Sequence, residues 1–257
     1  MVFTIAAGCE KNLGTNPTTL AEQLCTNNGS IVIAGGTWTH GASENSGTLI
    51  NNGAITHNGS GWDINETSLT NNSTGTISYA GTVLTIEENL TQNGAFDLSG
   101  KTVTFDTAAG GDHSTITCSG DLGGTVNFQK TNSSSISNIT VGAGCSIDLG
   151  NDPSTVGEQQ LMNNGTIVIS GGVWTHSNSE ANGTITNSGT ITHNGTGWDM
   201  NSTSLVNDPG RTITYAGSAI TIDRSFTQNG IFDLTGKTVT FDTDASGNDP
   251  STITCTG

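Results

Sequence analysis

The feature that most constrains this chain is a short phrase that recurs at nearly regular spacing. In each copy an apolar residue is followed two places later by Asn or Gln, then by Gly, and then by alternating apolar residues. Four copies open at Leu161, Ile185, Leu205 and Phe226, so the openings are 24, 20 and 21 residues apart. A repeat of this length predicts a solenoid in which each copy of the phrase forms one coil.

The pattern inside the phrase predicts strands and turns. When the first apolar residue is position 0, apolar side chains recur at positions 6, 8, 13 and 15, after allowance for two inserted residues in the Leu205 copy. Alternation at 6/8 and 13/15 is typical of strands with one buried face, and the Asn and Gly before position 6 favour a turn. Position 6 stays apolar, as Ile167, Ile191, Ile213 and Phe232. Such columns are what the interior of an all-β parallel β-helix requires.

A second repeat is longer. Cys9–Thr107 matches Cys145–Thr243 without a gap at a constant offset of 136 residues. We therefore predict one β-solenoid unit at 1–120, an extra coil or connecting segment at 121–137 and a second unit at 138–257. With coils of roughly 20–24 residues, the whole chain would hold about eleven coils.

Composition narrows the class of protein. Charged residues make up 11% of the chain, and 22 acidic against 6 basic residues give a formal net charge of −16. This charge disfavours nucleic acid and anionic membranes as partners. The low hydrophobic share of 32% would suit a disordered chain, but disorder gives no reason to preserve apolar columns. Residues 1–8 resemble neither a secretion signal nor a membrane span, and the composition favours an extracellular or cell-surface location.

The five cysteines suggest two kinds of disulfide. Cys118 and Cys145 are separated by about one coil plus the extra segment, and we predict a bond between them that joins the two units. In the longer repeat Cys9 corresponds to Cys145 and Cys255 corresponds to Cys118. Cys9 and Cys255 would therefore be placed at opposite ends of the chain for the same kind of disulfide between successive subunits. The alternative is that all five thiols stay reduced, with Cys25 on the apolar column at position 0.

Histidine and tryptophan recur together, and we assign them to the core rather than to a metal site or a sugar platform. They fall on columns that other coils fill with apolar residues, and no His or Cys spacing matches a zinc motif. The predicted core stack consists of Trp38, Trp62, Trp174, Trp198, His40, His57, His176 and His193.

No catalytic residue is predicted. Acidic residues such as Asp63 and Asp199 repeat at the 136-residue offset, so a catalytic dyad would occur twice. Arg211 and Arg224 have no basic counterparts in the first unit. We expect no cofactor, although weak calcium binding by the acidic faces stays open. Thr-x-Thr pairs recur along the chain, and regular rows of threonine are typical of ice-binding solenoids, so ice binding is a minor alternative.

The phrase apolar-x-Asn-x-Gly-Thr-Ile resembles the repeats of filamentous haemagglutinin-like and autotransporter-type surface adhesins. The resemblance implies a right-handed parallel β-helix and a secreted or cell-surface stalk, fibre or adhesin, and it carries over no catalytic residue. We expect a structural or adhesive protein, not an enzyme, that forms a homopolymer through its terminal coils. The alternative is a carbohydrate-binding or carbohydrate-active protein with a lateral groove, and a glycan or cell-surface ligand stays open as a partner.

Overall fold

The computed structural model describes most of the chain. The described residues are 3–20, 24–41, 47–65, 67–86, 88–98, 101–105, 114–118, 136–149, 151, 154–156, 160–177, 183–201, 203–242 and 252–255. They divide into two compact units, unit 1 at Met1–Ser134 and unit 2 at Ser135–Gly257. The predicted connecting segment lies outside the described residues up to position 135.

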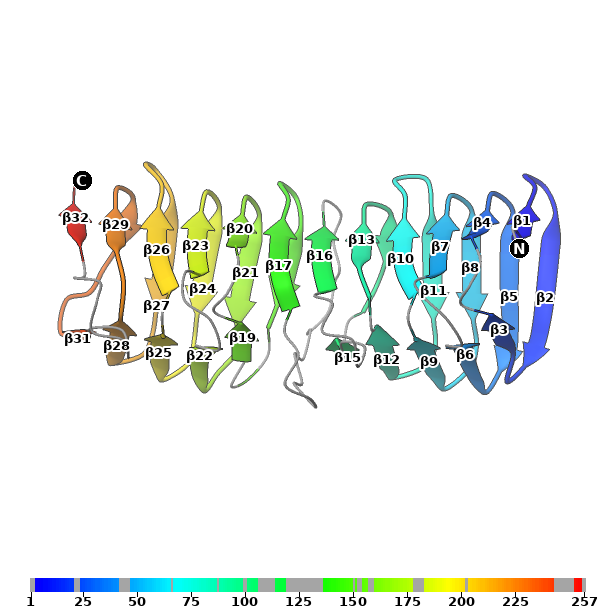
Figure 1. Ribbon diagram of the computed structural model, residues 1–257, viewed down its shortest axis with the longest axis horizontal. Coiled ribbons are helices and arrows are strands. Elements are labelled where there is room, and N and C mark those ends of the chain that lie inside the picture. Colours follow the sequence, from blue (N-terminus) through cyan, green and yellow to red (C-terminus); the bar gives the residue numbers. More distant parts are fainter. Residues whose placement is uncertain are drawn as a thin grey trace. The chain divides into compact units, whose positions relative to one another are not determined.

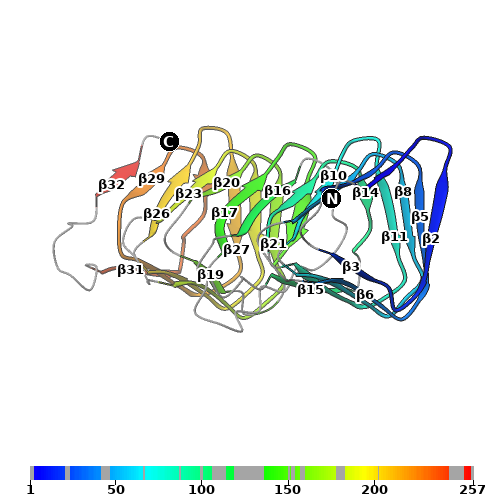
Figure 2. The ribbon, with the colours of Figure 1, turned by 45° about the vertical axis from the view of Figure 1, so that its right-hand side comes forward.

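Unit 1 is built from coils of three short strands, and each coil places one strand on each of three faces (Figures 1 and 2). The first face holds β1 (Phe3–Ile5), β4 (Leu24–Asn27), β7 (Gly47–Asn51), β10 (Thr67–Asn71), β13 (Leu90–Gln92) and β16 (Ser114–Cys118). The second holds β2 (Glu10–Thr15), β5 (Ser30–Gly35), β8 (Ala54–His57), β11 (Thr76–Tyr79) and β14 (Ala95–Phe96). The third holds β3 (Thr18–Leu20), β6 (Thr37–Gly41), β9 (Gly61–Ile64), β12 (Val83–Ile86) and β15 (Thr102–Phe105).

Unit 2 repeats this plan. Its first face holds β17 (Ile136–Val141), β20 (Gln160–Asn163), β23 (Gly183–Asn187), β26 (Thr203–Asn207), β29 (Phe226–Gln228) and β32 (Ile253–Cys255). Its second holds β18 (Ser146–Asp148), β21 (Thr166–Ile169), β24 (Thr190–His193), β27 (Thr212–Tyr215) and β30 (Ile231–Phe232). Its third holds β19 (Ser154–Val156), β22 (Val173–Ser177), β25 (Gly197–Met200), β28 (Ala219–Ile222) and β31 (Thr238–Phe241).

Within each unit the strands of a face pair in parallel, and equivalent positions of the phrase lie opposite each other. On the first face of unit 1, Leu49 pairs with Leu69 and Leu69 pairs with Leu90, all at position 0. On the third face, Trp38 pairs with Trp62 at position 13. The columns seen in the sequence are therefore physical columns, one coil above the next.

The core of each unit is the space that the three faces enclose. Strand β7 alternates buried and half-buried residues from end to end, and β26 does the same. Leu49 on β7, Leu69 on β10 and Leu205 on β26 are completely buried. Burying a leucine contributes roughly 1.5–3 kcal/mol relative to leaving it exposed, so the repeated columns supply most of the driving force for folding.

Glycine is required where the first face turns into the second, because successive coils approach closely there. A Cβ on Gly53 would lie 2.1 Å from the carbonyl oxygen of Gly29, and one on Gly189 would lie 2.2 Å from that of Gly165. These carbonyls accept hydrogen bonds from the next coil, as Gly29 O does from Ala54 N at 2.9 Å. The glycine at position 4 is thus set by contact between coils as well as by the turn.

The predicted all-β parallel β-solenoid is confirmed. The described strands form five complete three-stranded coils in each unit, with β16 and β32 as additional single strands. That total is slightly below the eleven coils expected. The described residues contain no helix of the length and apolarity needed to cross a membrane.

Candidate functional site

The most regular polar feature is a row of buried amides at position 2, here called the inner amide ladder. Asn27 Nδ2 donates to Asn51 Oδ1 at 2.7 Å, and Asn51 Nδ2 donates to Asn71 Oδ1 at 2.8 Å. Unit 2 repeats the ladder, with Asn163 donating to Asn187 and Asn187 to Asn207, both at 2.8 Å. Gln92 and Gln228 occupy the same position on β13 and β29.

The inner amide ladder also ties each coil to the backbone of the next. Asn27 Nδ2 makes a second bond to Ala54 O at 2.9 Å, and Asn163 Nδ2 makes one to Thr190 O at 2.9 Å. These amides are almost fully buried, and a buried amide is tolerated only when it is hydrogen-bonded. The sequence pattern assigned Asn at position 2 to a turn, so its role between coils was missed. The available signal was that Asn or Gln fills position 2 in successive coils.

A second row of polar side chains, the outer ladder, follows one residue later on the solvent side. In unit 1, Asn72 Nδ2 donates to Asn52 Oδ1 at 2.6 Å, and Asn52 Nδ2 donates to Asn28 Oδ1 at 2.8 Å. In unit 2 the corresponding contact is from the Ser188 hydroxyl to the Asp208 carboxylate. The two ladders lie side by side at the same turn, and only the inner one is fully buried.

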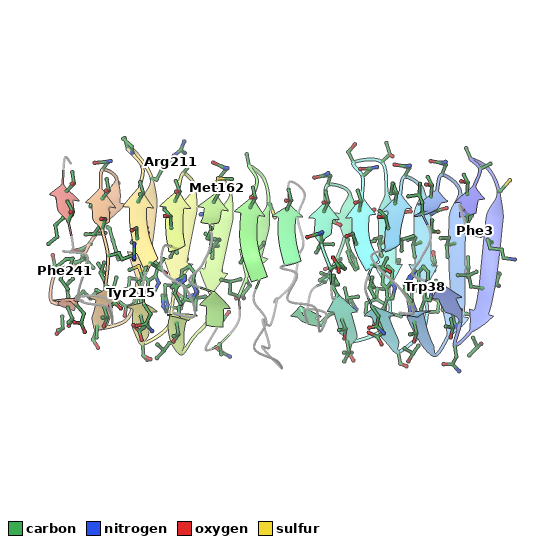
Figure 3. The ribbon with its side chains drawn as sticks, in the orientation of Figure 1. Phe3, Trp38, Met162, Arg211, Tyr215 and Phe241 are labelled. Carbon is green, nitrogen blue, oxygen red and sulfur yellow. The ribbon has the colours of Figure 1, made fainter. Side chains whose placement is uncertain are left out.

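The tryptophans of the predicted core stack lie on the inner side of the third face. The rings of Trp38 and Trp62 are parallel within 8°, with centroids 5.0 Å apart. Those of Trp174 and Trp198 are parallel within 10° at 4.9 Å. All four indoles are at most 1% exposed, so none of them is available as a platform for a sugar ring. Figure 3 labels Trp38 in unit 1.

The histidines of the stack are buried beside these indoles. The imidazole of His57 lies 5.6 Å from the Trp62 ring, and that of His193 lies 5.6 Å from the Trp198 ring. His193 Nδ1 accepts a hydrogen bond from Gly195 N at 3.0 Å, and its Nε2 donates to Gly197 O at 2.9 Å. His57 Nδ1 accepts from Gly59 N at 2.9 Å. Both rings are held as the tautomer with the proton on Nε2.

Burial keeps these histidines neutral. It lowers the pKa of His40 and of His176 to about 3, and that of His193 to about 4. The pKa of His57 is lowered for the same reason. Each ring that accepts a glycine N–H at Nδ1 has no lone pair left for a metal ion. Across the described parts of the chain, no group of three or more His, Cys, Asp or Glu residues is arranged to hold a metal.

A tyrosine and a lysine contact each other at the turn between the second and third faces of each unit. The Tyr79 hydroxyl donates to Val83 O, and burial raises its pKa to about 12. Lys101 Nζ donates to Gly81 O at 2.9 Å and lies 5.3 Å from the centroid of the Tyr79 ring. Lys237 lies 5.4 Å from the Tyr215 ring in unit 2. The sequence pattern did not indicate this contact.

The cysteines fall into two groups by exposure. Cys9 and Cys255 are exposed free thiols, and Cys25 is a half-buried free thiol. Cys25 pairs with Leu49 in the column at position 0, and burial raises its pKa to about 11. Cys118 and Cys145 are buried, each in its own unit. The bond predicted between them would join the two units and stays a prediction.

The repeated carboxylates are spread over the outer surface. Asp63 and Asp199 lie on β9 and β25, opposite Thr39 and Thr175 of the preceding coils. Burial raises the pKa of Asp199. At the turn after β30, the hydroxyl and backbone N–H of Thr235 lower the pKa of the fully exposed Asp233. These carboxylates have different surroundings on different faces, and no pair of them is brought together by the contacts described above.

No protein-family model, curated protein or solved structure matches this chain. The likeness to adhesin repeats therefore rests on the phrase alone, and the solenoid fold rests on the observed strand pairing. The side chains that repeat most faithfully are those that join one coil to the next.

Proposed function

We propose that this protein is an extracellular structural and adhesive repeat protein, a stalk or filament subunit whose copies stack end to end. One observation carries the proposal: columns buried inside a unit become exposed on the complete described coil nearest its end. Phe241 is 39% exposed on β31, whereas its column neighbours Ile222 and Met200 are 0% exposed. Phe241 is labelled in Figure 3.

Unit 1 has the same feature on its first coil. Phe3 on β1 is 38% exposed, whereas Leu49 and Leu69 further along the column at position 0 are completely buried. An uncovered coil also presents unpaired backbone N–H and C=O groups, which template further strands. Pairing a coil of unit 2 from one copy with the first coil of another would bury both the apolar side chains and the strand edges.

The polarity of the strands favours a filament over a closed dimer. All paired strands are parallel, so one end of a unit differs from the other, and contact between unlike ends is head to tail. A head-to-tail contact whose rotation does not close produces an open fibre. The net charge of −16 opposes association through the sides. Growth along the coil axis is therefore favoured over lateral aggregation.

The proposed setting is outside the cell. Charged residues make up only 11% of the chain, and the sequence is rich in Thr, Ser and Asn, a composition that favours this setting. In this setting the solenoid would project or link, and adhesion would come from its lateral surface. The likeness to adhesin repeats supports this assignment.

Ligand binding on a flat side is the second candidate, because threonines line up across coils. In unit 2, Thr190 pairs with Thr212 and Thr192 pairs with Thr214 on the second face. β-Branched side chains have few rotamers, so such columns form a regular array of hydroxyls and methyls. A glycan panel and a thermal-hysteresis assay on ice would detect this activity in unassembled protein, and Thr192→Lys should abolish it.

Sedimentation velocity in reductant tests the filament assignment. We expect residues 1–257 to form species that grow with concentration, and Phe241→Asp to prevent this growth by placing a charge on the uncovered coil. Met162→Asp is the matched control, because Met162 is 40% exposed on a lateral surface. A monomer at all concentrations, or equal effects of the two substitutions, would contradict the proposal.

A further inference from the structure

Cys9 and Cys145 occupy the same position in a wide version of the turn between the first and second faces. Cys9 N donates to Ala6 O at 3.1 Å, and Cys145 N donates to Gly142 O at 3.0 Å. Each carbonyl then accepts from the next coil, Cys9 O from Ser30 N and Cys145 O from Thr166 N, both at 2.9 Å. We call this place the wide-turn position.

Gly75 lies at the same wide-turn position and shows what a side chain there would meet. Its N–H donates to Asn72 O at 2.7 Å, and its carbonyl accepts from Ala95 N at 3.0 Å. A Cβ on Gly75 would lie 2.2 Å from Asn71 Oδ1 in its own coil and 2.5 Å from Asn51 O in the preceding coil. It would also lie 2.8 Å from Asn51 Nδ2, so the end of the position-2 side chain of the preceding coil reaches the wide-turn position. In a disulfide, the Cβ of one cysteine lies about 3 Å from the sulfur of the other. Stacking of coils therefore brings position 2 of one coil within disulfide reach of the wide-turn position of the next.

Cys255 occupies position 2 on the last described strand. It pairs with Gln228 on β29, just as Cys118 pairs with Gln92 on β13. The chain thus carries two cysteines at position 2 and two at the wide-turn position. Cys118 and Cys145 are buried, whereas Cys255 and Cys9 are exposed free thiols on coils with uncovered apolar residues.

We propose that Cys255 of one copy and Cys9 of a second copy form an intermolecular disulfide that locks the head-to-tail joint. The inference rests on the proposed end-to-end assembly, and its partner is a second copy of this chain. In the joint, β32 of one copy would pair with β1 of the next, which sets Ile253 against Phe3 at position 0. These two side chains are 53% and 38% exposed, and the contact would bury both.

The bond forms by thiol–disulfide exchange with a small disulfide oxidant such as oxidised glutathione. The thiolate of one cysteine attacks the oxidant and releases one glutathione thiolate, which leaves a mixed disulfide. The thiolate of the other cysteine attacks the sulfur of the first cysteine and releases the second glutathione. Two protein thiols are oxidised, one small disulfide is reduced to two thiols, and each cysteine proton passes to solvent or to a released glutathione.

Mixing two single variants tests the polarity of this joint. Cys9→Ser keeps the thiol at 255, and Cys255→Ser keeps the thiol at 9. With oxidised glutathione, each variant alone should stay monomeric on a non-reducing gel. Their mixture should give a dimer and nothing larger, whereas the unsubstituted chain should give a ladder of dimers, trimers and longer species. Cys25→Ser is the control, and it should keep the full ladder.

Several outcomes would overturn the inference. Dimers of either single variant alone would show Cys9–Cys9 or Cys255–Cys255 pairing, and a mixture that stays monomeric would show that the two thiols do not meet. Peptide mapping of the dimer must find Cys9 linked to Cys255. Sedimentation of the Cys9→Ser/Cys255→Ser variant separates this inference from the proposed function. If the double variant grows with concentration but the mixture of single variants does not cross-link, the disulfide inference fails and the assembly stands. If the mixture gives cross-linked dimers but the double variant does not grow, the end-to-end assembly is contradicted.

Discussion

The indole of Trp38 lies parallel to that of Trp62 one coil later, with ring centroids 5.0 Å apart. The arrangement recurs 136 residues on, between Trp174 and Trp198, at 4.9 Å. Offset-stacked aromatic pairs contribute about 0.5–1.5 kcal/mol beyond the area that they bury. Each unit therefore has a rigid aromatic centre that joins two consecutive coils.

Trp62→Ala should be among the most damaging single substitutions. Trp62 is 1% exposed and contacts Trp38, His57 and Tyr79, so truncation leaves a large cavity at a cost of about 3–5 kcal/mol. Val83→Ala on the neighbouring strand is the control, because Val83 is 48% exposed. Urea unfolding monitored by circular dichroism measures the free energy of unfolding of both variants. A loss of stability from Trp62→Ala no larger than that from Val83→Ala would contradict the packing described here.

The two ladders predict different outcomes for neighbouring asparagines. Asn51→Ala removes a fully buried amide, so Asn27 Nδ2 and Asn71 Oδ1 each lose the hydrogen bond that they make to Asn51. An unsatisfied buried polar group costs about 1–3 kcal/mol. Asn52→Ala removes a member of the outer ladder, where water can replace the lost bonds, and should cost about 0.5 kcal/mol. If urea unfolding shows the same loss of stability for Asn51→Ala and Asn52→Ala, burial of the inner amide is not what makes it important.

The row of glycines predicts a steric penalty. Gly53→Ala places a Cβ 2.1 Å from Gly29 O, which only a shift between coils can relieve. We expect a destabilisation of about 2 kcal/mol or more. Gly35→Ala is the matched control, because its Cβ would meet nothing closer than Thr15 Cγ2 at 3.8 Å. Thermal unfolding of the two variants under one set of conditions measures the contrast, and Gly53→Ala with an unchanged midpoint would be inconsistent with the close approach.

Buried histidines predict acid sensitivity with a definite sign. The pKa of His40 and of His176 is about 3 in the folded chain, below the ordinary 6.5, because burial disfavours the imidazolium. The unfolded chain therefore binds protons first as the pH falls below 6.5. The stabilisation is complete above pH 6.5 and is lost as the pH drops towards 3, by about 1.4 kcal/mol per histidine for each pH unit.

The double variant His40→Met/His176→Met isolates this contribution. Methionine is a fitting replacement because Met200 fills the same column one coil after His176. Between pH 6 and pH 4, the free energy of unfolding of the variant should fall less steeply than that of the unsubstituted chain, by about 2.7 kcal/mol per pH unit. The comparison removes the contribution of the carboxylates, which both proteins share. Parallel slopes would mean that the two histidines are protonated in the folded state.

The fold was predictable because each coil repeats its apolar positions. Ile167, Ile191 and Ile213 recur at position 6, and only stacked strands use such a column. The inner amide ladder was not predicted, since Asn at position 2 is equally consistent with a simple turn. Its bond from Asn51 to Asn71 depends on coil-to-coil register, which one copy of the phrase does not reveal. The contact of Lys101 with Tyr79 was missed because it joins the ends of different coils.

Electron microscopy of the chain 1–257 tests the central claim most directly, because it shows assembly and its geometry together. We predict filaments one solenoid wide in negative stain, present at high protein concentration and more persistent when the thiols are oxidised. Phe241→Asp should leave short isolated particles, and Met162→Asp should leave the filaments unchanged. Short isolated particles of the unsubstituted chain at every concentration, with or without reductant, would contradict end-to-end stacking.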